Sequence, residues 1–270
     1  MHSRCRCRRM VAIIVLALAG AVPVVKAQLA VELKLDRELY IKYEPVRAIV
    51  SIRNYSGNAL DFGDAQEPRG DLTIILNGED AVAQGMTERT NVLAGRVLAP
   101  GETARFVVTV NALFNLQKPG GYTIAGQVGH QRLRSDYRTK KASFRVSEGE
   151  SLWRQSIGIP TGPKDGEITD RQVSLLVLHE RDASVYCLRI EDAERVYQVI
   201  RLGAGILGGE PVCMIDAVSN VHVLTRVKSR LFSYRVFDYG GKQKQKRYYA
   251  PVGVMPVLER DEKTGRVRVL

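Results

Sequence analysis

Three glycines, Gly203, Gly205 and Gly208, have the G-x-G-x-x-G spacing of a dinucleotide-binding loop. In such a loop the glycines follow a strand and open a helix, whose N-terminal amides then hold the pyrophosphate. Here Pro211 follows closely, and the residues after it have the pattern of a strand rather than of a helix. We therefore interpret the glycines as a loop between strands and predict no nucleotide cofactor.

The histidines beyond the N-terminal segment, His130, His179 and His222, are far apart and lack paired cysteines or carboxylates at metal-ligand spacing. His222 aligns with Arg268 in the repeat described below, which predicts a tolerant strand position. No nucleophile elbow is present. The sequence therefore predicts no metal site, no catalytic residues and no enzymatic activity. A hydrolase built from scattered residues stays as an alternative, and would show several ionisable groups converging in one deep pocket.

A basic segment is the strongest candidate for binding, because residues 226–247 hold eight basic side chains and one acid. Alternating lysines on a strand share one face, and aromatic residues lie close by in the sequence. Two interpretations stay open, a patch for an anionic polymer or surface and an edge strand whose lysines block unwanted pairing. The candidate residues are Arg226, Lys228, Arg230, Lys242, Lys244, Lys246 and Arg247.

The N-terminus predicts export. Four arginines precede an apolar run at residues 10–22, which is the pattern of a cleaved secretory signal peptide covering residues 1–27. The run is shorter than the roughly 20 residues that a membrane span needs, so we predict a secreted or periplasmic protein without a membrane span. Removing five basic residues with this segment lowers the formal net charge from +11 to +6. Nucleic acid is not expected as a partner of an exported chain.

Residues 28–148 show short alternating runs separated by turn residues, which predicts an all-β protein beginning with an antiparallel β-sandwich. About seven short strands in this length suit a β-sandwich. The predicted strands are residues 30–35, 46–54, 72–76, 105–110, 122–128 and 143–146.

Several short motifs of this half occur together at characteristic places. They are Asp36, Tyr40, Glu44-Pro45-Val46, Asn54, Leu98-Ala99-Pro100-Gly101-Glu102 and Pro119-Gly120-Gly121-Tyr122. With these motifs the half resembles the macroglobulin-type immunoglobulin-like domains of secreted bacterial proteins. Tyr43 stands where such domains usually have glycine, so the first bend is expected to differ. The resemblance implies a spacer or binding module, and makes a protein-binding adaptor or protease inhibitor acting through the sandwich loops an alternative function.

The second half contains an internal repeat. The pattern Pro-Val-x-x-x-Asp at residues 211–216 recurs 45 positions later at residues 256–261, and an earlier copy is visible around Asp170. Units of about 46 residues with four strands each resemble propeller blades in size. Two units and a closing strand are too few for a closed propeller. We therefore expect residues 170–270 to form two stacked β-meanders or one continuous sheet, with open edges that favour self-association or tight packing against the first half. The strands predicted in the second copy are residues 221–224, 231–239, 242–249 and 255–259.

Residues 149–169, rich in proline and glycine, are predicted to link the two halves, with Trp153 as a packing anchor. Cys187 and Cys213 are placed by this strand order on strands two apart, beyond the roughly 7 Å between Cα atoms that a disulfide spans. We therefore expect both to be free thiols.

Overall fold

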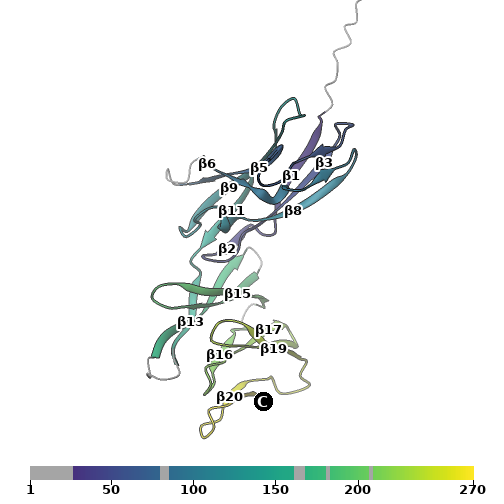
Figure 1. Ribbon diagram of the computed structural model, residues 1–270. Coiled ribbons are helices and arrows are strands. Elements are labelled where there is room, and N and C mark those ends of the chain that lie inside the picture. Colours follow the sequence, from purple (N-terminus) through teal and green to yellow (C-terminus); the bar gives the residue numbers. More distant parts are fainter. Residues whose placement is uncertain (1–26, 80–84, 161–167, 181–182, 207–208) are drawn as a thin grey trace, which may run out of the picture.

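The computed structural model describes residues 27–79, 85–160, 168–180, 183–206 and 209–270. The predicted signal peptide lies outside these residues, apart from its last position. The described chain is all-β, as predicted. Its strands form an N-terminal sandwich followed by a stack of smaller antiparallel sheets (Figure 1).

The sandwich consists of two sheets around one core. Its first sheet has the order β1-β3-β8 and its second the order β2-β11-β9-β5-β6, with β10 paired to β9 and a separate β4–β7 pair. Two facing sheets around a shared core form a β-sandwich, as predicted. The bounds are β1 Leu29–Leu35, β2 Leu39–Ile41, β3 Arg47–Asn54, β4 Leu60–Asp61, β5 Gly70–Gly78, β6 Met86–Thr90, β7 Val97–Leu98, β8 Thr103–Thr109, β9 Gly120–His130, β10 Tyr137–Arg138 and β11 Ala142–Ser147. Two 3-10 turns, Asn91–Leu93 and Val110–Ala112, connect them.

Alternation of apolar and polar residues explains these strands. In β3, Ala48, Val50 and Ile52 are fully buried while their neighbours face outward, as a pleat with a two-residue period requires. All six strands predicted for this half are present. The short strands β2, β4, β6, β7 and β10 were not predicted, and β2 pairs with β11 in parallel, unlike the antiparallel remainder.

Two positions shape the turns around the junction between the halves. Tyr43 has a φ of 71°, the left-handed conformation that glycine adopts most easily, so the bend keeps the backbone that glycine would give. Gly149, at φ 75°, connects β11 to the next strand, and a Cβ there would lie 2.8 Å from Ile41 Cδ1. A side chain at position 149 would therefore be strained by this φ and would displace the end of the Ile41 side chain.

The C-terminal half consists of two four-stranded meanders and a two-stranded ribbon. We call the sheet β12-β13-β14-β15 the first stacked sheet, β16-β17-β18-β19 the second stacked sheet, and β20-β21 the terminal ribbon. The bounds are β12 Glu150–Pro160, β13 Ile168–Glu180, β14 Ala183–Glu191, β15 Val196–Gly205, β16 Val212–Ile215, β17 Val221–Lys228, β18 Leu231–Phe237, β19 Gln243–Tyr249, β20 Leu258–Arg260 and β21 Val267–Val269.

Apolar layers hold these sheets in a stack that leads away from the sandwich (Figure 1). Ile41 of the sandwich packs with Leu176 and Cys187 on one face of the first stacked sheet. The opposite face of that sheet packs on the second stacked sheet, where Phe237 is 1% exposed. The other face of the second stacked sheet packs on Leu258 of the terminal ribbon. Each apolar face is covered by the next sheet, so no propeller closure is needed.

The predicted linker is wrong, because residues 150–160 form β12. Side chains at the start of this edge strand, such as Ser151 and Arg154, are exposed and hide the alternation. The strand supplies the first member of the first stacked sheet, so each unit begins one strand earlier than predicted. Trp153 packs against the layer between the stacked sheets, as expected for an anchor. Gly203 and Gly205 lie within β15 and not in a loop.

The repeat reflects turns closed by aspartates. Asp216 and Asp261 follow the first strand of their units, and each accepts backbone N–H bonds from residues two and more positions on. Asp192 and Asp238 close the turns after the third strands in the same way. Such aspartate turns reverse the chain without a long loop, which accounts for the common period. The earlier copy at Asp170 differs, because Asp170 lies within β13 and is paired there with Gly158 of β12.

Candidate functional site

The seven basic residues singled out in the sequence lie on the second stacked sheet. They come from β17, from the β17–β18 turn, from the β18–β19 turn and from β19, and all except the half-buried Arg226 are exposed. β19 pairs only with β18 and is therefore an edge strand. In this edge strand, lysines alternate with glutamines before Arg247 and Tyr248. We call these seven residues with β19 the β19 edge.

The seven residues do not form one compact patch. Lys242 lies in the turn before β19, and Lys244 lies at a bulge where the β18–β19 register shifts. The prediction that Lys242, Lys244 and Lys246 share one regular face is therefore wrong. The turn with Lys228 and Arg230 lies at the opposite end of the strands, roughly 20 Å away along seven residues. The positive charge is spread along the whole edge.

None of the seven forms an ion pair within the part of the chain that the structure describes. Lys244 Nζ donates to Asn220 Oδ1 at 2.7 Å, and Lys246 lies 5.2 Å from the centre of the Tyr248 ring. Arg226 donates to the carbonyl of Ser229 and so closes the β17–β18 turn. The edge thus presents positive charges whose partners are neutral groups.

Residues 250–257, which connect β19 to β20, are an apolar segment that sequence analysis missed. Val252 is 96% exposed, Val254 is 89% exposed, and Met255 is also exposed. A strand was predicted from residue 255, but β20 begins only at Leu258. We call this segment the apolar connection. It begins directly after Tyr249, and in Figure 1 it runs along the outside of the C-terminal half.

Cation–π contacts between one arginine and two tyrosine rings join the two stacked sheets. The Arg171 guanidinium lies 3.8 Å from the centre of the Tyr197 ring and 5.2 Å from that of Tyr239, and it donates to the Tyr239 carbonyl at 2.9 Å. Stacking of this kind suits a planar, weakly hydrated cation. The buried Nε of Arg171 has no hydrogen-bond partner among the described residues. The cluster therefore connects β13 and β15 of one sheet to the end of β18 in the next.

His222 is buried and doubly hydrogen-bonded, so the expectation of a tolerant strand position is wrong. Its Nδ1 lies 2.7 Å from Tyr234 Oη, and its Nε2 lies 3.1 Å from Asp216 Oδ2. Burial acts to raise the pKa of Asp216, but hydrogen bonds from Asn220 and His222 outweigh it and lower that pKa. The group ties the β16–β17 turn to β18.

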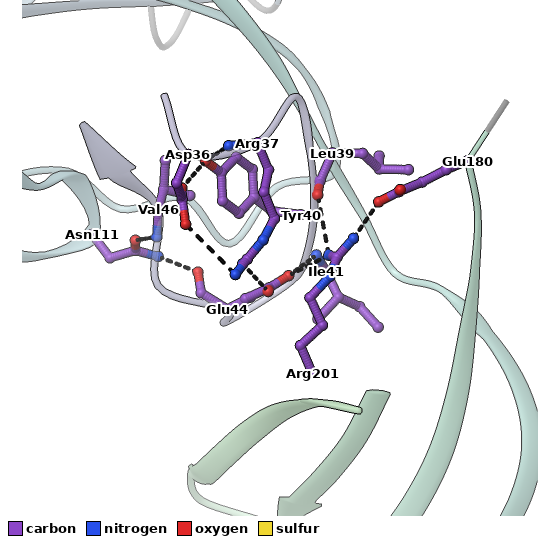
Figure 2. A network of polar contacts seen from close by, with 10 residues as sticks. All are labelled: Asp36, Arg37, Leu39, Tyr40, Ile41, Glu44, Val46, Asn111, Glu180 and Arg201. Carbon is purple, nitrogen blue, oxygen red and sulfur yellow. Dashed lines mark hydrogen bonds and ion pairs between the residues drawn. The ribbon is translucent and has the colours of Figure 1, made fainter. Parts of the chain in front are cut away.

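A buried carboxylate joins the sandwich to the first stacked sheet (Figure 2). Glu44, only 4% exposed, accepts from Arg37 Nη1 at 2.6 Å and from the backbone N–H of Ile41 at 3.0 Å. Arg201 of β15 reaches the second oxygen of Glu44 at 3.4 Å and also binds Glu180. Figure 2 shows Arg201 between these carboxylates. We call Glu44, Arg37, Arg201 and Glu180 the interdomain network.

A pocket of about 600 Å³ lies beside this network. It is lined by Arg37, Glu38, Leu39, Arg145, His179, Glu180 and Arg201. Its ionisable groups already have partners in part, since Glu180 binds Arg201 and Arg37 binds Glu44. These ion pairs connect the sandwich to the first stacked sheet.

Ser184, His179 and Glu150 form a chain next to that pocket. Ser184 Oγ lies 3.3 Å from His179 Nδ1, and His179 Nε2 lies 3.3 Å from Glu150 Oε2. Catalytic triads bury the acid that orients the imidazole, whereas here the Glu150 and His179 side chains are 69% and 65% exposed. These long contacts join exposed side chains of neighbouring strands at the end of a sheet. We assign them no catalytic role.

The two cysteines of the described chain are buried. Cys187 and Cys213 are buried free thiols in separate sheets, so the expectation of free cysteines is confirmed although Cys213 lies on β16 rather than on a fourth strand of the first sheet. Burial raises the pKa of Cys187 to about 12 and that of Cys213 still further above its ordinary value. Within the described ranges no three His, Cys, Asp or Glu side chains gather as a metal site, and no helix could span a membrane.

Comparisons with known proteins identify no relative in sequence. No family model matches the chain, and no curated protein matches it. Among solved structures, a Pseudomonas fluorescens alkylpurine DNA glycosylase bound to DNA has a TM-score of 0.32 at 11% identity, over 44% of this chain and 30% of its own. Spo0M, a sporulation control protein from Bacillus subtilis, has a TM-score of 0.30 at 12% identity, over 66% of this chain and 91% of its own. TM-scores this low indicate neither a shared fold nor a shared function.

Proposed function

We propose that this chain is a non-catalytic, exported binding module that holds an anionic polymer or surface along the β19 edge. The observation that carries the proposal is the set of seven basic side chains on β19, its preceding turn, the end of β17 and the turn that follows it, none of which forms an ion pair within the described residues. The function rests on charge complementarity and needs no cofactor.

The charge distribution supports this proposal. Residues 28–150 hold 16 basic and 15 acidic side chains, a net charge of +1, whereas residues 151–270 hold 19 and 14, a net charge of +5. The excess therefore belongs to the stacked half. Clustered charge of one sign raises the local concentration of partners of the opposite sign.

Edge protection explains only part of the basic segment. Lysines on an exposed edge strand discourage pairing with another strand, and Lys244 and Lys246 have that position. Lys228 is the last residue of β17, paired with Leu231, and Arg230 lies in the turn that follows. Neither residue belongs to β19, so protection of that edge does not account for them.

Retention of residues 28–270, which contain every strand, on immobilised heparin across a salt gradient tests the proposal. A variant with Lys242, Lys244, Lys246 and Arg247 changed to glutamine should elute at much lower salt. A matched control with the exposed sandwich residues Arg47, Arg105, Lys140 and Lys141 changed to glutamine has the same charge and should elute near the wild type. Equal elution of the two variants would show that only net charge matters, and would contradict the proposal.

A further inference from the structure

One end of the second stacked sheet combines exposed apolar residues with basic ones. Arg226, Phe232 and Tyr249 form a row across β17, β18 and β19 at that end. Beyond this row lie Lys228 at the end of β17, Arg230 in the β17–β18 turn, and the start of the apolar connection. The basic residues and the apolar connection therefore both leave from this end of the sheet.

The apolar connection is held out from the fold by its backbone. Gly253 has a φ of 103°, and a Cβ placed there would meet no atom within 4 Å. Pro256, which is buried, returns the chain to the terminal ribbon, and Val257 forms backbone hydrogen bonds with Leu270. Val252 and Val254 thus project from a bend that is fixed at both of its ends.

We propose that this end docks onto an anionic lipid bilayer, with Val252, Val254 and Met255 entering the boundary between headgroups and acyl chains while Lys228, Arg230 and Arg247 meet lipid phosphates. Interfacial binding draws on these two contributions, buried apolar area and attraction to anionic headgroups. This inference rests on the proposed function and identifies the anionic surface that the chain binds as a lipid bilayer.

Charge complementarity favours a bilayer over other occupants. A second copy placed against this end would bring its own Lys228 and Arg230 against those of the first, and like charges face to face are costly. A soluble polyanion would satisfy the basic residues but offers no apolar phase for valines that are about nine-tenths exposed or more. A bilayer with acidic headgroups satisfies both sets of side chains.

Vesicle binding measures this directly. Residues 28–270 are mixed with sedimenting vesicles of phosphatidylglycerol and phosphatidylcholine in equal parts, or of phosphatidylcholine alone, and the bound fraction is measured. We expect binding to the acidic vesicles only. The Val252→Ser/Val254→Ser variant should lower the partition coefficient at least about tenfold, since two valine side chains lose their apolar phase. The control Val97→Ser/Val107→Ser removes two exposed valines from the sandwich and should leave binding unchanged.

A second pair of variants tests the orientation. Lys228→Gln/Arg230→Gln removes charge beside the apolar connection and should weaken vesicle binding more than Lys242→Gln/Lys244→Gln at the far end of β19. In addition, Val254→Trp should show a blue-shifted emission on acidic vesicles and quenching by brominated acyl chains. Trp153 in the wild type gives the background signal.

The outcomes separate this inference from the proposed function. Retention on heparin that depends on β19, without vesicle binding, would leave the proposed function standing and overturn the bilayer inference. Vesicle binding that Val252→Ser/Val254→Ser does not change would overturn it as well. Vesicle binding that depends on the apolar connection, with no retention on heparin, would instead overturn the β19 proposal alone. A wild-type dimer that becomes a monomer in the valine variant would identify a second copy as the occupant.

Discussion

The two halves of the molecule bury their apolar surface in different ways. The sandwich encloses one core between two sheets, and its basic and acidic side chains nearly balance. The C-terminal half instead buries its apolar residues in successive layers, because each stacked sheet covers one face of its neighbour and the stack ends in a ribbon of two strands. Unpaired charge and exposed valines both gather near that end. The last member of a stack therefore has an outer surface whose residues are not constrained by packing. Such a surface is free to serve in binding.

The largest expected effect comes from opening the layer between the stacked sheets. Phe237→Ala should cost about 3–5 kcal/mol of stability, as for other buried phenylalanines. Hydrogen exchange should then rise in β13, β14, β17 and β18 while β5 and β9 stay protected, because the sandwich has its own core. Phe62→Ala in the sandwich is the reciprocal variant of similar cost. Uniform loss of protection in both halves would show that the halves unfold as one unit.

The interdomain network tests how far the halves depend on each other. Glu44→Ala leaves Arg37 with only Asp36 and Arg201 with only Glu180, and it removes the acceptor of the Ile41 N–H at a site where Glu44 is 4% exposed. We therefore expect a loss of about 2–3 kcal/mol in chemical denaturation. Glu148→Ala, which breaks the exposed contact with Lys42, should cost less than about 1 kcal/mol. Equal effects of the two variants would mean that burial of the network contributes nothing.

The sandwich could be predicted well because its strands follow local rules. Alternation in β3 and turn residues between the strands suffice, since one face of each strand is buried and the other faces water. Alternation fails for β12, whose first residues are exposed on an edge, and this strand was mistaken for a linker. The repeat was visible because Asp216 and Asp261 close equivalent turns, yet its starting point depended on the missed strand.

The candidate site was only partly predictable. The basic residues were evident from composition, but their spread along β19 depends on a bulge at Lys244 that no local pattern marks. The interdomain network joins Glu44 to Arg201, which is 157 residues away in the chain, so only the tertiary fold brings them together. His222 likewise needs its partners Asp216 and Tyr234 to be recognised as buried. The apolar connection was readable as an exposed segment only once its end at Leu258 was known.

A smaller effect is expected at the Asp216–His222–Tyr234 group within the second stacked sheet. Because hydrogen bonds lower the pKa of Asp216 in the folded chain, its contribution is present above the unfolded pKa of about 4 and is lost as the pH falls through the folded value. Asp216→Asn should therefore destabilise by about 1–2 kcal/mol at pH 7 and show a smaller difference from the wild type near pH 3. Urea denaturation at both pH values measures this. A constant difference would assign the effect to the turn alone.

The two cysteines can report on the apolar layers without altering stability. Cys187 lies between the sandwich and the first stacked sheet, and Cys213 lies between the two stacked sheets. Burial, with the nearby charge of Glu44, raises the pKa of Cys187 to about 12, and burial alone raises that of Cys213, so both should resist a thiol reagent at pH 8 in residues 28–270 and react fully in urea. In Phe237→Ala, Cys213 should react well before Cys187, because the layer between the stacked sheets opens first. Simultaneous labelling would mean that a single opening event exposes both layers. The first stacked sheet would then unfold together with the second stacked sheet, and not with the sandwich.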